Sequence, residues 1–256
     1  MKDKNTGKKR FFKAIERYLL SIILICLVLL SSTSTASAAS LTERIEQFPQ
    51  WTSKPSLKPA KKDLEYPEWM AGTWNVKSTL VEQFAPLAPD IVTPGFKDNQ
   101  NYLDRPIAFQ VRFGKYATPP VVVADRAFNG EKIAQAYLGN DNIYRIKVDP
   151  DNPNQQITFL KGDRQLISKI TARGREIPTD NRFITTEVTQ QLFRSPERLY
   201  LNEVETTSSY ELLDAENISA EQITAIYLSP QDPDYFTAGD RPVALYHYHL
   251  ALTKYE

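Results

Sequence analysis

Residues 73–254 form a long series of segments in which apolar and polar side chains alternate. In residues 107–113, isoleucine, phenylalanine and valine occupy every second position, with alanine, glutamine and arginine between them. A period of two predicts β-strands with one buried face. Comparable segments predict about ten strands, at residues 73–84, 107–113, 120–125, 142–148, 156–160, 165–172, 182–193, 198–208, 223–228 and 242–254.

Short links join most of these strands. Asp, Asn, Pro and Gly dominate links such as residues 149–153 and 161–163, and these residue types favour tight reversals. Consecutive strands with short links predict an antiparallel meander, and closure into a barrel protects the edges of a meander most completely. We therefore expect an all-β, up-and-down barrel of about ten strands rather than a β-sandwich. Residues 243–254 are expected to pair back to the first strand.

Two segments interrupt the series of strands. Residues 131–138 fit either one or two turns of helix or half of a hairpin with residues 121–128. Their pattern leaves both alternatives open, because a short apolar segment has no decisive period. Residues 219–222 fit a capped turn before the strand at residues 223–228.

The first predicted strand begins with Gly72-x-Trp74. A small barrel needs a large flat side chain to seal one end, and glycine lets the chain turn beneath it. This opening resembles the signature of lipocalin-type barrels, and the resemblance implies that Trp74 plugs a closed barrel end. The family's disulfides are absent here, and the sequence identifies no counterpart of the arginine that packs over the family's tryptophan.

Residues 1–38 have the three parts of a cleavable signal peptide. Seven basic residues precede Tyr18, residues 18–30 are apolar, and residues 31–40 are all Ser, Thr or Ala. This order is typical of export, with cleavage expected after Ala38. An uncleaved membrane anchor is the alternative, since the uncharged stretch extends toward the roughly 20 residues that span a bilayer.

Removal of this segment changes the chemistry of the chain. The formal net charge of the whole sequence is zero, whereas the part after residue 38 has 24 basic and 29 acidic residues. The only cysteine, Cys26, is also removed, so no disulfide can form. No basic cluster remains for nucleic acid, and the nine scattered glycines provide no phosphate-binding loop.

Residues 39–66 are polar and contain several prolines. This composition predicts a linker or a strap before a barrel domain at residues 67–256. Residues 41–47 are long enough for at most two helical turns. Phe48, Trp51 and Leu57 could pack a strap against the domain, and Trp51 is expected to be a packing anchor.

The stretch from Trp69 to Phe113 carries a second resemblance. It contains FAPLAPDIVTPGF at residues 84–96 and YLDRPI at residues 102–107. It is similar to an uncharacterised family of cyanobacterial and plastid proteins associated with the thylakoid lumen. This resemblance implies a location in the thylakoid lumen or the periplasm, and it implies no known activity.

The link between the first two strands, residues 86–105, is far longer than the two to five residues of a typical hairpin loop. Long loops in compact domains are commonly lids or binding loops, and in a lipocalin-like barrel this loop covers the open end. The apolar residues of the loop are therefore candidates to line a ligand entrance, or else they fold the loop onto the barrel end. They are Leu87, Ile91, Val92, Phe96 and Tyr102.

The two histidines, His247 and His249, are two residues apart on one strand and share a face. Imidazoles at this spacing can bind a metal such as zinc, if a carboxylate such as Glu203 or Glu205 completes the site. The alternative is a solvated or structural role, because the opposite face of the strand carries the core residues. Glu203 and Glu205 likewise fit a solvated face with basic partners.

Three functions fit these features. The first is an exported, non-catalytic lipocalin-like protein that binds a small apolar or amphipathic ligand, such as a pigment, lipid or quinone. The second is a non-catalytic interaction or assembly protein of the thylakoid lumen or periplasm, and the third is a metal-dependent enzyme that uses the two histidines. The sequence specifies no cofactor, excludes nucleic acid as a partner, and limits membrane contact to a retained signal segment.

Overall fold

The computed structural model describes residues 40–116 and 120–256. The chain divides into two compact units, residues 1–38 and 39–256. The predicted signal peptide and its cleavage site lie outside the described residues. Within the described ranges, no helix is both long enough and apolar enough to cross a bilayer.

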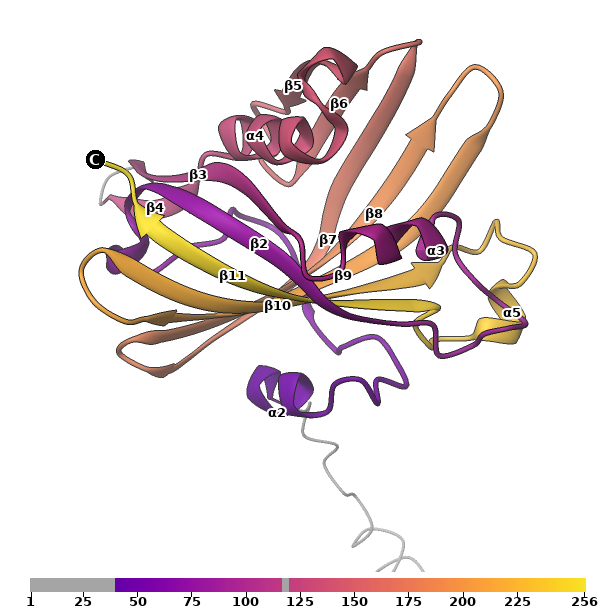
Figure 1. Ribbon diagram of the computed structural model, residues 1–256, viewed down its shortest axis with the longest axis horizontal. Coiled ribbons are helices and arrows are strands. Elements are labelled where there is room, and N and C mark those ends of the chain that lie inside the picture. Colours follow the sequence, from indigo (N-terminus) through magenta and orange to yellow (C-terminus); the bar gives the residue numbers. More distant parts are fainter. Residues whose placement is uncertain (1–39, 117–119) are drawn as a thin grey trace, which may run out of the picture. The chain divides into compact units, whose positions relative to one another are not determined.

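The second unit is built on one curled antiparallel sheet, which confirms the all-β, barrel-like prediction (Figure 1). Its strands follow the order β4-β3-β2-β11-β10-β9-β8-β7-β6-β5, and a short strand β1 pairs with β7 outside this order. The strands are β1 (Lys58–Pro59), β2 (Gly72–Phe84), β3 (Pro106–Tyr116), β4 (Val121–Ala124), β5 (Ile143–Val148), β6 (Gln155–Leu160), β7 (Arg164–Thr179), β8 (Arg182–Arg194), β9 (Leu199–Leu212), β10 (Asn217–Leu228) and β11 (Ala244–Lys254).

The strand order is that of an up-and-down barrel with one pairing missing. The last strand, β11, pairs with β2 as expected, with Leu252 opposite Val76. In the described part of the chain, β4 and β5 are consecutive strands that do not pair, and they form the two ends of the sheet. Strand β4 has only four residues, and Asp125 caps a helix directly after it. The chain thus forms a helix where full closure requires a hairpin, and the sheet is a half-barrel.

Within residues 40–116 and 120–256, four α-helices accompany the sheet: α2 (Leu41–Glu46), α3 (Phe96–Asn99), α4 (Arg126–Leu138) and α5 (Tyr235–Ala238). Helix α4 packs between β3 and β5 on the concave side of the sheet (Figure 1). The helical alternative for residues 131–138 is therefore correct. The predicted turn at residues 219–222 is wrong, because β10 continues through it.

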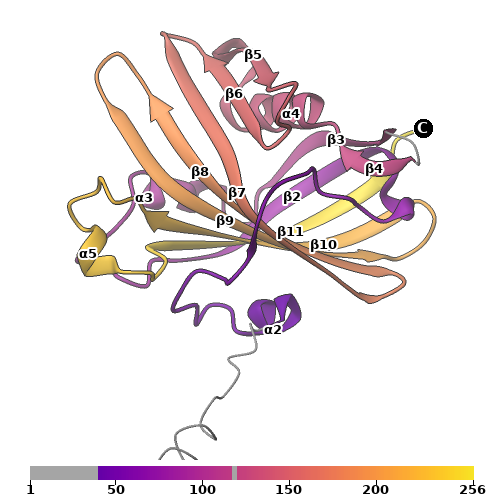
Figure 2. The same ribbon diagram turned by 180° about the vertical axis from the view of Figure 1, so that it is seen from behind.

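The first part of the segment before β2 lies on the convex face of the sheet, on the side opposite α4 (Figure 2), and the later part crosses to the open seam. Trp51 is buried in a cluster with Ile223, Tyr227 and Leu245, and Phe48 packs against this cluster. The strap then pairs with β7 through β1, and Tyr66 forms a bridge with Val122 of β4. This segment, which we call the strap (residues 40–66), therefore contacts strands on both sides of the open seam.

A buried ion pair fixes the strap to the convex face. The side chain of Glu205 is 0% exposed, and its oxygens accept bonds of 2.5 and 2.6 Å from Arg44. Tyr227 and Thr207 donate to the same carboxylate at 2.7 and 3.0 Å, and the Arg44 guanidinium lies 3.9 Å from the ring centre of Trp51. Burial opposes the charge of Arg44, but Glu205 outweighs that effect and raises the Arg44 pKa. The prediction that Glu205 lies on a solvated face is therefore wrong.

The end of the half-barrel near the C-terminus is closed by aromatic and aliphatic side chains. Trp74 is 0% exposed, and its indole donates a 2.8 Å bond to the Met70 carbonyl. The Lys254 ammonium lies 4.4 Å from the Trp74 ring centre and donates to the Ala71 carbonyl at 2.6 Å. Gly72 has a φ of 120°, which L-residues rarely adopt. The sequence indicated no arginine that packs over Trp74. In the structure, Lys254 of the last strand packs there instead.

Candidate ligand cavity

Two adjoining pockets lie on the concave face of the sheet. The pocket nearer Trp74 has a volume of about 280 Å³, and the other has a volume of about 190 Å³. Ser78, Tyr137 and Tyr248 line both, so we treat them as one cavity. The period of two on β2, β3 and β11 places the lining side chains on one face. The larger pocket is mainly apolar, with Val76, Phe109, Val111, Phe113, Leu250 and Leu252 among its lining residues.

Helix α4 covers this cavity without filling it. The helix buries none of its residues, although Ile133, Tyr137 and Leu138 line the pockets beneath it. These three side chains remain 38, 37 and 49% exposed. A helix in a packed domain normally buries an apolar stripe. The apolar side chains of α4 face the cavity instead of packing against the sheet.

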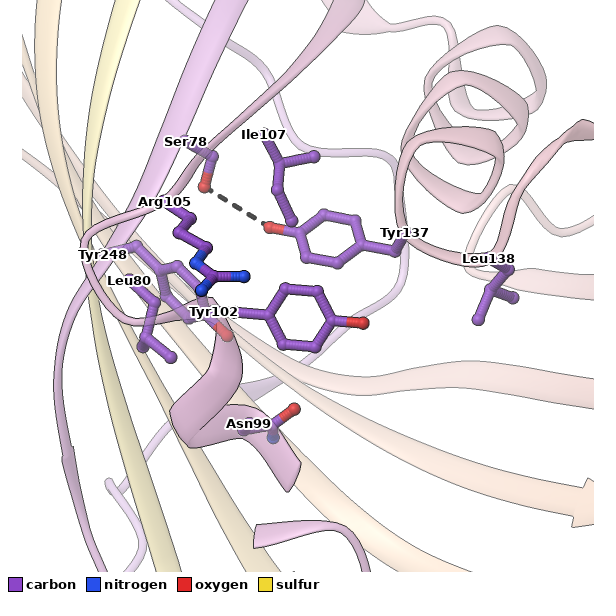
Figure 3. Close-up of a pocket in the computed structure, with 9 residues that line it drawn as sticks. All are labelled: Ser78, Leu80, Asn99, Tyr102, Arg105, Ile107, Tyr137, Leu138 and Tyr248. Carbon is purple, nitrogen blue, oxygen red and sulfur yellow. Dashed lines mark hydrogen bonds between the residues drawn. The ribbon is translucent and has the colours of Figure 1, made fainter. Parts of the chain in front are cut away.

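One polar contact joins the helix to the floor of the cavity. The Tyr137 hydroxyl lies 3.5 Å from the Ser78 hydroxyl of β2 (Figure 3). The Phe109 ring is 6.4 Å from the Tyr137 ring, centre to centre. Burial raises the pKa of Tyr137 above its ordinary value, and the bond from Ser78 partly offsets this effect. Tyr137 is therefore a neutral hydroxyl that is able either to donate or to accept a hydrogen bond where the two pockets meet.

The base of α4 is fixed by charged side chains at the seam. Arg126 donates to Asp63 of the strap at 2.6 Å and lies 3.4 Å from Glu187 of β8. Arg173 of β7 bonds to the same Glu187 carboxylate. Burial lowers the Arg126 pKa, but Glu187 and Asp63 outweigh it and raise the pKa overall. The first turn of α4 is thus held to both the strap and the sheet.

The end of the cavity away from Trp74 is formed by the last part of the long loop. Asn99, Tyr102 and Arg105 line the smaller pocket together with Leu80 and Ile107 (Figure 3). Asp104 adopts a φ of 57° between Tyr102 and the start of β3, and its amide donates to the Leu80 carbonyl at 2.9 Å. This turn places Tyr102 and Arg105 at the end of the cavity that is away from Trp74.

The five loop residues that the sequence predicted to line a ligand entrance lie in different places in the structure. Tyr102 lines the cavity. Phe96 packs against Tyr246, 5.9 Å between ring centres, while Leu87 and Ile91 join a cluster beside α5 that folds the loop onto the sheet end. Val92 is 40% exposed. Four of the five thus lie away from the lining, and only Tyr102 contributes to it.

Sequence reasoning missed the cavity residues of α4 and Arg105. The pattern of residues 131–138 fitted a helix and a hairpin equally, so it assigned no buried face to Ile133, Tyr137 and Leu138. Asp125 was the available signal, because aspartate before a run of helix-forming residues is a typical N-cap, and here its side chain accepts from the Phe128 amide at 3.1 Å.

The histidines do not meet Glu203 or Glu205. The His247 ring lies beneath Phe48 of the strap, 5.0 Å between ring centres, and its nitrogens are 3.6 and 3.7 Å from Glu82 and Glu221. His249 instead contacts Ser219. In residues 40–116 and 120–256, no group of three or more His, Cys, Asp or Glu side chains is arranged to hold a metal ion. Of the predicted solvated or structural roles, His249 is exposed to solvent, whereas His247 is packed under the strap.

Residues 58–256 match the family described as "Domain of unknown function (DUF6816)". The chain belongs to the DUF6816 family. The matched residues include every strand from β1 to β11, helix α4 and the whole cavity, whereas Arg44 and Trp51 of the strap precede them. No curated protein and no solved structure matches this DUF6816 chain.

Proposed function

We propose that this DUF6816 protein is a non-catalytic carrier or receptor that binds a small apolar or amphipathic ligand in the cavity beneath α4. The observation that carries the proposal is the helix itself, which directs Ile133, Tyr137 and Leu138 toward an apolar surface and buries none of them. Apolar side chains left facing an unfilled cavity lose contacts that a ligand would restore.

We also propose that residues 1–38 export the domain to the thylakoid lumen or the periplasm. The basic, apolar and small-residue order of this segment supports the proposal. N-terminal sequencing of protein from its host tests it: Ala39 as the first residue supports cleavage, and Met1 contradicts it.

The binding proposal is tested by isolating the protein from its own host and identifying co-purified small molecules by absorbance and mass spectrometry. Thr224 lines the cavity from β10, so Thr224→Trp should fill it and exclude the ligand. Thr253 is exposed on β11, and Thr253→Trp is the matched control with the same added volume. Equal ligand content in both variants contradicts the proposal.

A further inference from the structure

The charge within the cavity restricts the chemistry of its ligand. The lining of the two pockets is apolar, aromatic or neutral and polar, except for one residue, Arg105. Its guanidinium has no ion-pair partner and no side-chain hydrogen bond in the described part of the chain. By contrast, Arg126 and Arg173 at the seam are both bonded to Glu187.

The position of Arg105 gives the cavity two unlike ends. Arg105, Asn99 and Tyr102 line the smaller pocket beside the long loop. The larger pocket extends along β2 and β3 toward the end closed by Trp74, and its lining includes Val76, Phe113 and Leu252. Figure 3 shows the Arg105 side chain among the rings of Tyr102, Tyr137 and Tyr248.

We infer that the ligand is a single-chain amphiphile with an anionic head, carboxylate or phosphate, which binds Arg105 while the hydrocarbon tail lies in the larger pocket. This inference rests on the proposed ligand-binding function. Guanidinium groups bind carboxylates and phosphates through paired N–H donors. Asn99 and the hydroxyls of Tyr102 and Tyr137 supply further neutral donors near the head.

The size of the cavity favours one chain over two. Small-molecule sites span roughly 300–1,000 Å³. The two pockets, of about 190 and 280 Å³, reach the lower half of this range only when taken together as one cavity. The surrounding protein after residue 38 is acidic overall. Arg105 is thus the local feature that would favour a negative head at this opening.

The test measures binding of three probes to the delipidated full-length protein by tryptophan fluorescence or calorimetry. Oleate carries a carboxylate, oleoyl lysophosphatidic acid carries a phosphate, and oleyl alcohol has the same chain without charge. We expect at least one anionic probe to bind about tenfold or more tightly than the alcohol. Which anion binds more tightly distinguishes the two kinds of head group.

Arg105→Gln should remove this preference, so that neither anionic probe binds more tightly than oleyl alcohol, while Arg105→Lys should retain part of it. Arg198→Gln, an equal change of charge in the exposed turn between β8 and β9, is the matched control and should have no effect. If all three probes bind equally, or if Arg105→Gln acts no differently from Arg198→Gln, the anionic-head inference is wrong but the cavity still binds apolar ligands. If no probe binds and none co-purifies, the proposed function fails as well.

Discussion

Replacement of Arg44 by methionine should weaken the attachment of the strap and strongly destabilise the protein. The Arg44→Met change leaves the Glu205 carboxylate 0% exposed and deprives it of two charged hydrogen bonds. Breaking a buried ion pair from one side costs about 3–5 kcal/mol. Tyr227 and Thr207 still donate to Glu205, so we expect the lower end, about 3 kcal/mol. For a domain of this size, that loss lowers the Tm by about 6–12 °C.

The assay is urea unfolding followed by circular dichroism, with limited proteolysis of the strap as a second readout. Arg44→Met/Glu205→Gln removes the unpaired charge and keeps an acceptor for Tyr227, so it should recover more than half of the lost free energy of unfolding. Lys54→Met is the matched control, because the Lys54–Glu203 pair is partly exposed, and such pairs contribute about 0–1 kcal/mol. A double variant as unstable as Arg44→Met, or an Arg44→Met no worse than Lys54→Met, would refute the reasoning.

Three further perturbations test other parts of the fold. Lys254→Met removes the cation above Trp74 and should lower the free energy of unfolding by about 1–2 kcal/mol, measured by urea titration; an unchanged midpoint contradicts this. Gly72→Ala forces a side chain at a φ of 120° and brings its Cβ to 2.8 Å from the Lys254 ammonium, so it should cost about 1–3 kcal/mol in the same titration. Burial raises the pKa of Tyr66 and Tyr210 above 10.0 in the folded protein. As the pH rises, these tyrosines therefore lose their protons first in the unfolded chain. Their contribution to the free energy of unfolding is full below about pH 10 and falls above it. Tyr66→Phe should make the alkaline decline of the Tm shallower, and an identical decline rules out this source.

The strands could be predicted from the sequence, because alternation directly reports a half-buried sheet. The pairing of β11 with β2 also followed, since a meander without it leaves both strands as edges. The open seam did not follow. Strand β4 is a run of three valines and an alanine that reads as a strand like its neighbours, and only its four-residue length and the cap at Asp125 indicate that a helix comes next.

The sequence indicated where a cavity would lie but not which residues would line it. The long loop and Gly72-x-Trp74 indicated two ends of a barrel, and Tyr102 does lie at the opening. Ile133 and Tyr137 reach the same cavity from a helix that follows β4, through a three-dimensional arrangement that no local pattern encodes. Glu205 shows the same limit, since its polar neighbours on β9 indicated solvent, whereas Arg44, 161 residues away in the chain, makes its burial possible.

The pairing of β2 with β11 also has a consequence for how the chain folds. The Lys254 ammonium bonds to the Ala71 carbonyl across 183 residues of sequence, and β11 is the strand that joins β2 to β10. Contacts between such distant residues carry a large loop-closure cost and slow folding. The pairings of β11 with β2 and β10 therefore cannot form until β11 has been synthesised. Such a delay suits a protein whose proposed export requires the chain to remain unfolded during translocation.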